Sequence, residues 1–234
     1  MTIRFEKKFK LEDVINKEKE YHLWIISMGI ARQDLYFDIG QMKRIIDSGN
    51  QEGLFYFTKL SISHVNEVIA LLKSASEKYH EVFSQFTRID NFLKEYNELL
   101  ELCEGNDNNS FFKRVLSEAR NNYFHYNKGN WNDRKKEYDF ESTKKILESL
   151  YREKFFTGFK IGDSIGENDF YFADDIQINW LFKLGKEYQL NESDLLEKIS
   201  EITSKTMRVL TIVIDDFFIN KTSKDIGFNI RYRR

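Results

Sequence analysis

An arginine and a histidine five residues apart are the two side chains of this sequence best suited to chemistry on a phosphodiester. Arg120 is permanently charged and can hold a phosphate through parallel hydrogen bonds, whereas His125 titrates near neutral pH and can transfer protons. Asn121 follows the arginine directly, and aromatic residues flank the histidine: Tyr123, Phe124 and Tyr126. A phosphate binder beside a proton-transfer group is what cleavage of an RNA backbone requires.

The spacing of this pair constrains the mechanism. On an ideal α-helix, residues five apart point about 140° away from each other, so Arg120 and His125 do not share one regular helix face. Asn121 and His125 do share a face, and the amide is expected to orient the imidazole. Three arrangements bring the arginine to the histidine: a long reach of its side chain, an irregular helix, or a second protomer.

Chemistry favours the second protomer. Attack by the neighbouring ribose 2′-hydroxyl needs a base for that hydroxyl and an acid for the leaving 5′-oxygen, and one histidine does not easily serve both. A two-fold dimer would bring two copies of His125 and Arg120 into one cleft. We therefore expect a homodimer with a composite active site, in which the arginines bind the phosphate and stabilise its added charge.

Basic residues surround the candidate pair. Seven lysines and arginines lie between residues 113 and 136, against two acidic residues. The net charge of the whole chain is only −2, which argues against indiscriminate coating of nucleic acid. We expect RNA as the partner, with a predicted substrate-binding set of Lys113, Arg114, Tyr126 and Lys128. Solvated surface is the alternative interpretation of such a charge run.

No metal or cofactor is expected. Cys103 is the only cysteine, and no second histidine or cysteine stands at metal-ligand spacing from any of the other histidines, which are His22, His64 and His80. The acidic pairs at 174–175 and 215–216 are typical of helix surfaces, and the glycines between 158 and 166 lack the G-K-[ST] of a phosphate loop.

The composition predicts an all-α fold. The chain of 234 residues has no proline and only 11 glycines, whereas folds with many turns use both repeatedly. The charged first ten residues do not resemble a secretory signal, and no apolar run reaches the ~20 residues of a membrane span. With a single cysteine, these features predict a cytoplasmic, soluble protein without a membrane partner.

Apolar residues recur at helical spacing in several segments. The predicted helices cover 11–47, 60–72, 83–103, 111–123, 141–153 and 193–219. Stop and start signals agree with them, with Ser48-Gly49-Asn50 and Glu104-Gly105 ending helices and Ser110 capping one. Phe111, Val115, Leu116, Ala119 and Tyr123 are expected to face inward, as is Cys103. Segment 154–172 is rich in glycine and aromatics, which favours a β-hairpin or an irregular insertion.

The segment from Arg120 to His125 resembles the R-[polar]-x-x-x-H signature of the HEPN superfamily, helical proteins many of which are metal-independent ribonucleases. The resemblance implies a single HEPN-like bundle over residues 1–234, with helical extensions at both ends. It also implies cleavage to a 2′,3′-cyclic phosphate and a 5′-hydroxyl, in phage defence or toxin-like growth arrest. A protein antitoxin or regulator is a further expected partner.

One departure and two alternatives accompany that interpretation. HEPN toxins paired with nucleotidyltransferase antitoxins have a tyrosine two residues after the histidine, where this chain has Asn127, so regulation through that tyrosine is not expected. The first alternative is a non-catalytic, HEPN-like binding or regulatory module. The second is an unrelated helical interaction protein in which His125 is packed between aromatic side chains.

Overall fold

The computed structural model describes residues 10–49, 53–104, 108–121, 131–132, 137–138, 141–151, 157–158, 161–163 and 172–221. The fold is all-α, as predicted, with a single two-residue ladder in the described part. The helices are α1 (Leu11–Val14), α2 (Glu20–Ser48), α3 (Leu54–Lys78), α4 (His80–Phe86), α5 (Phe92–Leu102), η1 (Phe112–Ser117, a π-helix), α6 (Glu141–Leu150), α7 (Phe172–Glu187), α8 (Glu192–Asp215) and η4 (Asp216–Lys221, also a π-helix).

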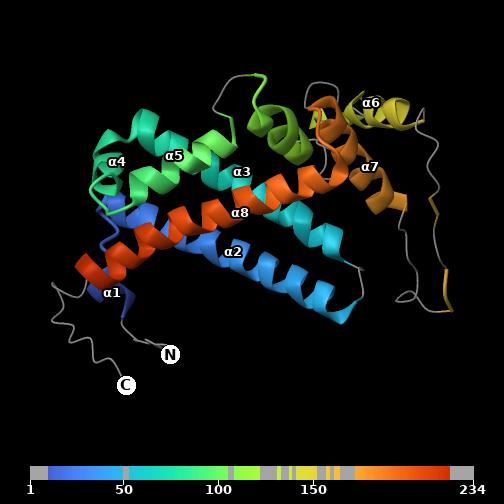
Figure 1. Ribbon diagram of the computed structural model, residues 1–234. Helices are drawn as coiled ribbons and strands as arrows, with labels where there is room; N and C mark the ends of the chain where they lie inside the picture. The colour runs from blue at the N-terminus through green and yellow to red at the C-terminus, as the bar shows by residue number, and fades with distance from the viewer. Residues whose placement is uncertain are drawn as a thin grey trace.

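Three long helices form the centre of the bundle. In Figure 1, α3 and α8 run alongside α2 in the opposite direction, while α4 and α5 lie together near one end and α6 and α7 near the other. Their shared core is built from fully buried aliphatic and aromatic side chains, which include Met28, Leu35, Ile62, Leu72, Phe86, Phe92, Leu99 and Leu210. Burial of this apolar surface is the main stabilising term of the fold.

Several predicted helix ends are confirmed. α2 ends at Ser48, and Gly49 follows it in the left-handed conformation (φ 71°) that glycine adopts without steric cost. Ser110 is buried and its hydroxyl accepts a hydrogen bond from the Lys113 N–H at 3.2 Å, as expected of an N-cap. Cys103 and the inward residues of the following helix up to Ala119 are buried. Tyr123 lies outside the described residues.

Other boundaries differ from the prediction. The segment 11–47 is divided between α1 and α2, and the helix expected over 83–103 is two helices, α4 and α5. Asn91 precedes α5 with φ 64°, which no continuous α-helix allows. Helix α7 was not predicted. Most of 154–172 lies outside the described residues, whereas a short antiparallel ladder joins β1 (Trp131–Asn132) to β2 (Glu137–Tyr138).

The helix leading to the candidate site is irregular. Phe112–Ser117 forms a π-helix, and Arg120 and Asn121 return to π-helical hydrogen bonding after one α-helical pair. In a π-helix the hydrogen bonds join residues five apart, so residues at that separation lie closer to one face than they do on an α-helix. An irregular helix, one of the three arrangements considered for Arg120 and His125, is therefore observed as far as Asn121, whereas His125 lies outside the described residues.

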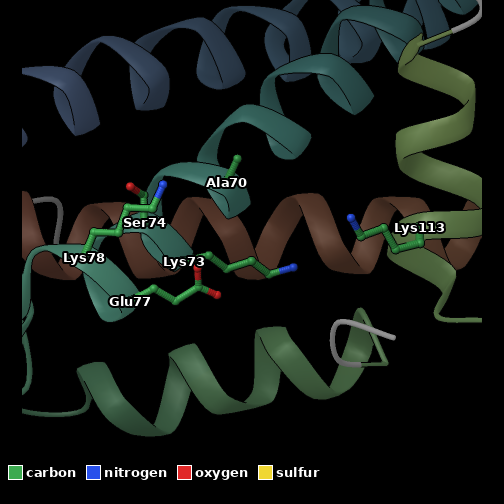
Figure 2. A pocket seen from close by; sticks show the side chains of 6 residues that line it. All are labelled: Ala70, Lys73, Ser74, Glu77, Lys78 and Lys113. Carbon is green, nitrogen blue, oxygen red and sulfur yellow. The ribbon is translucent and has the colours of Figure 1, made fainter. Parts of the chain in front are cut away.

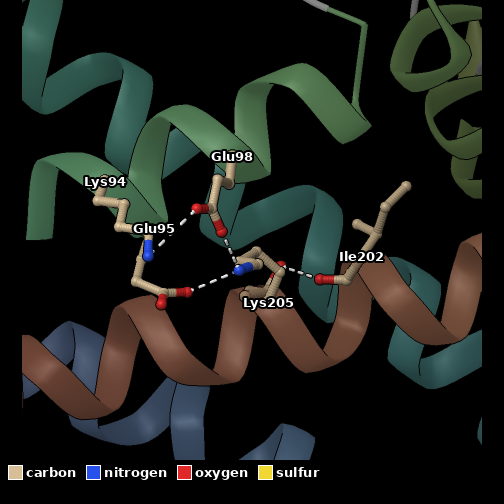
Figure 3. Close-up of polar contacts among 6 residues, drawn as sticks. Lys94, Glu95, Glu98, Ile202 and Lys205 are labelled. Atoms are coloured by element: carbon tan, nitrogen blue, oxygen red, sulfur yellow. Dashed lines mark hydrogen bonds and ion pairs between the residues drawn. The ribbon is translucent and has the colours of Figure 1, made fainter. Parts of the chain in front are cut away.

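Lys205 of α8 joins two turns of α5. Its ammonium donates to Glu95 at 2.8 Å and also to Glu98, which in turn lies near Lys94 one turn away (Figure 3). These hydrogen bonds raise the pKa of Lys205 and lower that of Glu98. The cluster fastens α5 to α8 with its charges matched. No helix in the described part of the chain is long and apolar enough to cross a membrane.

Candidate functional site

Arg120 lies against α3. Its Nη2 donates to the Glu67 carboxylate at 3.1 Å, and its side chain is about one quarter exposed. The Nε atom is buried and has no hydrogen-bond partner among the residues that the structure describes. A guanidinium has five N–H donors, so a single carboxylate at one of them leaves capacity for an anion. Glu67 was not predicted as part of the site.

The other predicted catalytic residues are less constrained by the structure. Asn121 is exposed at the end of the described helix, while His125, Tyr126 and Lys128 lie outside the described residues. The predicted orientation of His125 by Asn121 therefore stays a prediction. Among the predicted substrate-binding residues, Arg114 and Lys113 are both exposed, two turns before Arg120.

Three observations place this segment next to α3. Lys113 lines a pocket with Lys73, Ser117 accepts a hydrogen bond from the Asn66 amide at 3.2 Å, and Arg120 binds Glu67. The segment therefore packs against α3, with Lys113 near Lys73 and Arg120 near Glu67. Lys73 and Lys78 of α3 are further basic residues there, and sequence reasoning missed them because they lie some 40 residues away from Lys113 in the chain.

A second titratable pair lies one turn from Glu67 on α3. The His64 imidazole contacts the almost fully buried Asp38 carboxylate of α2 at 2.9 Å between Nδ1 and Oδ2, and the ring is about one quarter exposed. The hydrogen bond to Asp38 raises the pKa of His64 above its ordinary value of 6.5, although burial opposes the shift. His64 is isolated in the sequence, yet the fold gives it a carboxylate partner.

The remaining described histidines are structural or exposed. His22 accepts a hydrogen bond from the Asn16 N–H at 3.1 Å and packs edge-on against Phe217, and burial lowers its pKa. His80 is exposed at the start of α4. Within the described ranges, no three His, Cys, Asp or Glu side chains are grouped so that they could hold a metal ion.

The structure is an all-α bundle in which two lysines of α3, Lys73 and Lys78, line a pocket together with Lys113 of η1. Comparison with protein-family models, with curated proteins and with solved structures found no match in any of the three.

Proposed function

We propose that this protein is a metal-independent endoribonuclease of HEPN type. The bond broken is the one between phosphorus and the 5′-oxygen, after attack by the neighbouring 2′-hydroxyl, which leaves a 2′,3′-cyclic phosphate and a 5′-hydroxyl. In this proposal Arg120 binds the phosphate, His125 transfers protons, and Asn121 orients the histidine.

The observation that carries the proposal is the setting of Arg120. The guanidinium is partly buried between its own helix and α3, and Glu67 fixes it through one of its five donors. An arginine held in this way is oriented before substrate arrives, which lowers the entropy lost on binding a phosphate. Because Glu67 accepts from one donor, a phosphate can bind the guanidinium through the remaining donors.

The proposed enzyme acts as a homodimer. One His125 deprotonates the 2′-hydroxyl and the partner's copy protonates the leaving oxygen, with two arginines at the phosphate. A role in phage defence or growth arrest, and restraint by a protein antitoxin or regulator, belong to the same proposal and come from the motif resemblance alone.

The deciding experiment is RNA cleavage in EDTA by the wild type and by His125→Ala. Loss of one acid–base group is expected to lower the rate at least 100-fold, with cyclic-phosphate ends on the wild-type products. His80→Ala is the matched control, since it removes an exposed histidine elsewhere, and it should cleave normally. Unchanged cleavage by a folded, dimeric His125→Ala protein would remove His125 from the mechanism.

The second candidate is a non-catalytic module that binds RNA or a protein through the same surface. It is favoured by the ion pair between Arg120 and Glu67, which leaves the guanidinium already partnered in the free protein. The two candidates separate in the same assay, because the binding module retains RNA without producing cleaved ends in either variant.

A further inference from the structure

A pocket opens between α3 and the start of η1. Its volume is about 410 Å³, within the range of ligand sites, and it is lined by Ala70, Lys73, Ser74, Glu77, Lys78 and Lys113. Figure 2 shows the amino groups of Lys73 and Lys113 directed toward one another from two different elements, with Lys78 at the other end of the pocket. Five of the six lining residues are charged or polar and three of them are lysines, which suits an anion.

Packing fixes the position of Lys73. Its ammonium lies over the Phe112 ring at 4.1 Å from the centroid. Phe112 is buried, and its backbone N–H donates to the carbonyl of Cys103 at the end of α5. The face of the Phe112 ring attracts the Lys73 ammonium through a cation–π interaction. The aliphatic part of a lysine side chain can pack on apolar surface while its charged end stays accessible. The ammonium group is thus held at the pocket rather than extended freely into solvent.

The charges of the pocket are not balanced. Three ammonium groups and one carboxylate line it, and neither Lys73 nor Lys113 forms an ion pair within the part of the chain that the structure describes. Burial lowers the pKa of Lys73 below its ordinary value of 10.5, and the charge of Lys113 acts in the same direction, against Cys103 and Glu77. A bound anion would offset the repulsion from Lys113 and favour the charged form of Lys73.

Glu67, the ion-pair partner of Arg120, lies on the same helix as most of the pocket lining. Glu67, Ala70 and Ser74 follow one another at spacings of three and four residues, so they share one face of α3. The helical rise places Ser74 about 10 Å along the axis from Glu67, the partner of Arg120. A strand of a few nucleotides is long enough to cover that distance.

We propose that the Lys73–Lys113 pocket binds a backbone phosphate of single-stranded RNA a few nucleotides from the phosphate held by Arg120. The inference rests on the proposed function, since it assigns the flanking part of the same substrate. Lys73 and Lys113 supply the charge, and Glu77 limits affinity by repelling the phosphate. Contacts of this kind are independent of base sequence, so the pocket positions the strand without selecting it.

The test uses 2′-O-methyl oligouridine labelled with fluorescein, which lacks the attacking hydroxyl and therefore cannot be cleaved by the proposed route. Binding to the intact protein is measured by anisotropy over a range of salt concentrations. We expect Lys73→Met with Lys113→Met to weaken binding about tenfold and to reduce the slope of log K against log salt by about 1.4, or about 0.7 per lysine. Lys43→Met together with Lys144→Met, both exposed on other helices, is the matched control.

A change of opposite sign strengthens the design. Glu77→Gln should tighten binding about twofold to threefold, a gain that damage to the fold does not produce. Unchanged affinity in the double lysine variant, or equal loss in the Lys43 and Lys144 control, overturns the proposal. The two proposals fail separately. If the double lysine variant loses binding and the wild type never cleaves RNA, the pocket is supported and the nuclease is rejected. If the double lysine variant binds normally and the wild type cleaves RNA, the nuclease is supported and the pocket is rejected.

Discussion

Two partly buried lysines of this bundle have opposite surroundings. Lys205 is bonded to two carboxylates of α5, and its pKa is raised (Figure 3). Lys73 faces a second lysine and an aromatic ring, and its pKa is lowered, mainly by burial (Figure 2). In the matched cluster around Lys205 the positive and negative charges are equal in number, and the cluster joins two helices. In the unmatched cluster around Lys73 the positive charges outnumber the negative ones, and the cluster lines a cavity. Charge balance, rather than residue type, therefore separates a structural lysine from a candidate ligand-binding one.

The largest effect is expected from breaking the matched cluster. Lys205→Glu places three carboxylates side by side between α5 and α8, so their repulsion should lower the Tm by roughly 5 °C. Differential scanning calorimetry measures the shift. Lys94→Glu makes the same change of charge at a position 71% exposed, and its Tm should fall much less. Equal shifts in the two variants would mean that the cluster does not fasten the helices.

A smaller effect of different sign is expected at the unmatched lysine. Lys73→Met removes an ammonium without a carboxylate partner, and the methionine sulfur retains contact with the Phe112 ring. We expect the Tm to stay the same or to rise by about 2 °C, whereas Lys205→Met should lower it. Thermal unfolding by circular dichroism compares the two. A fall of several degrees in Lys73→Met would identify this lysine as a structural anchor.

The smallest effect concerns a pair between these extremes, Asp38 and His64, which is matched only while the imidazole is protonated. Because the folded-state pKa of His64 is raised, its contribution to stability is complete below about pH 6.5 and is lost as pH rises through the shifted value. The Tm difference between wild type and His64→Gln should therefore be larger at pH 6 than at pH 8.5. His80→Gln controls for removing a histidine, and a difference independent of pH would contradict the assignment.

The sequence was informative where structure is determined locally. Gly49 ends α2 through its own conformation, and Ser110 caps its helix through a residue three positions away, so both could be predicted from neighbouring residues. Helix α7 was missed since its buried positions, such as Leu181 and Leu184, alternate with polar residues in no clear apolar stripe. The break before Asn91 has no proline or glycine to mark it.

The candidate site is harder to predict because its contacts join distant parts of the chain. Arg120 was recognised from a local motif, but Glu67 is 53 residues away and meets it only through the packing of two helices. The same holds for Asp38 and His64, which are 26 residues apart. The π-helical turns that lead to Arg120 could not be predicted either, because no residue type in Phe112–Ser117 is specific to a π-helix.

Cys103, at the end of α5, gives this bundle a built-in chemical probe. The thiol is fully buried, burial raises its pKa to about 12, and the chain has no other cysteine. A thiol-specific reagent can therefore react only during openings that expose the end of α5, and the labelling rate measures their free energy without any engineered residue. Since the N–H of Phe112 is hydrogen-bonded to the Cys103 carbonyl, the same rate reports on openings that disturb Phe112, whose ring lies under the Lys73 ammonium.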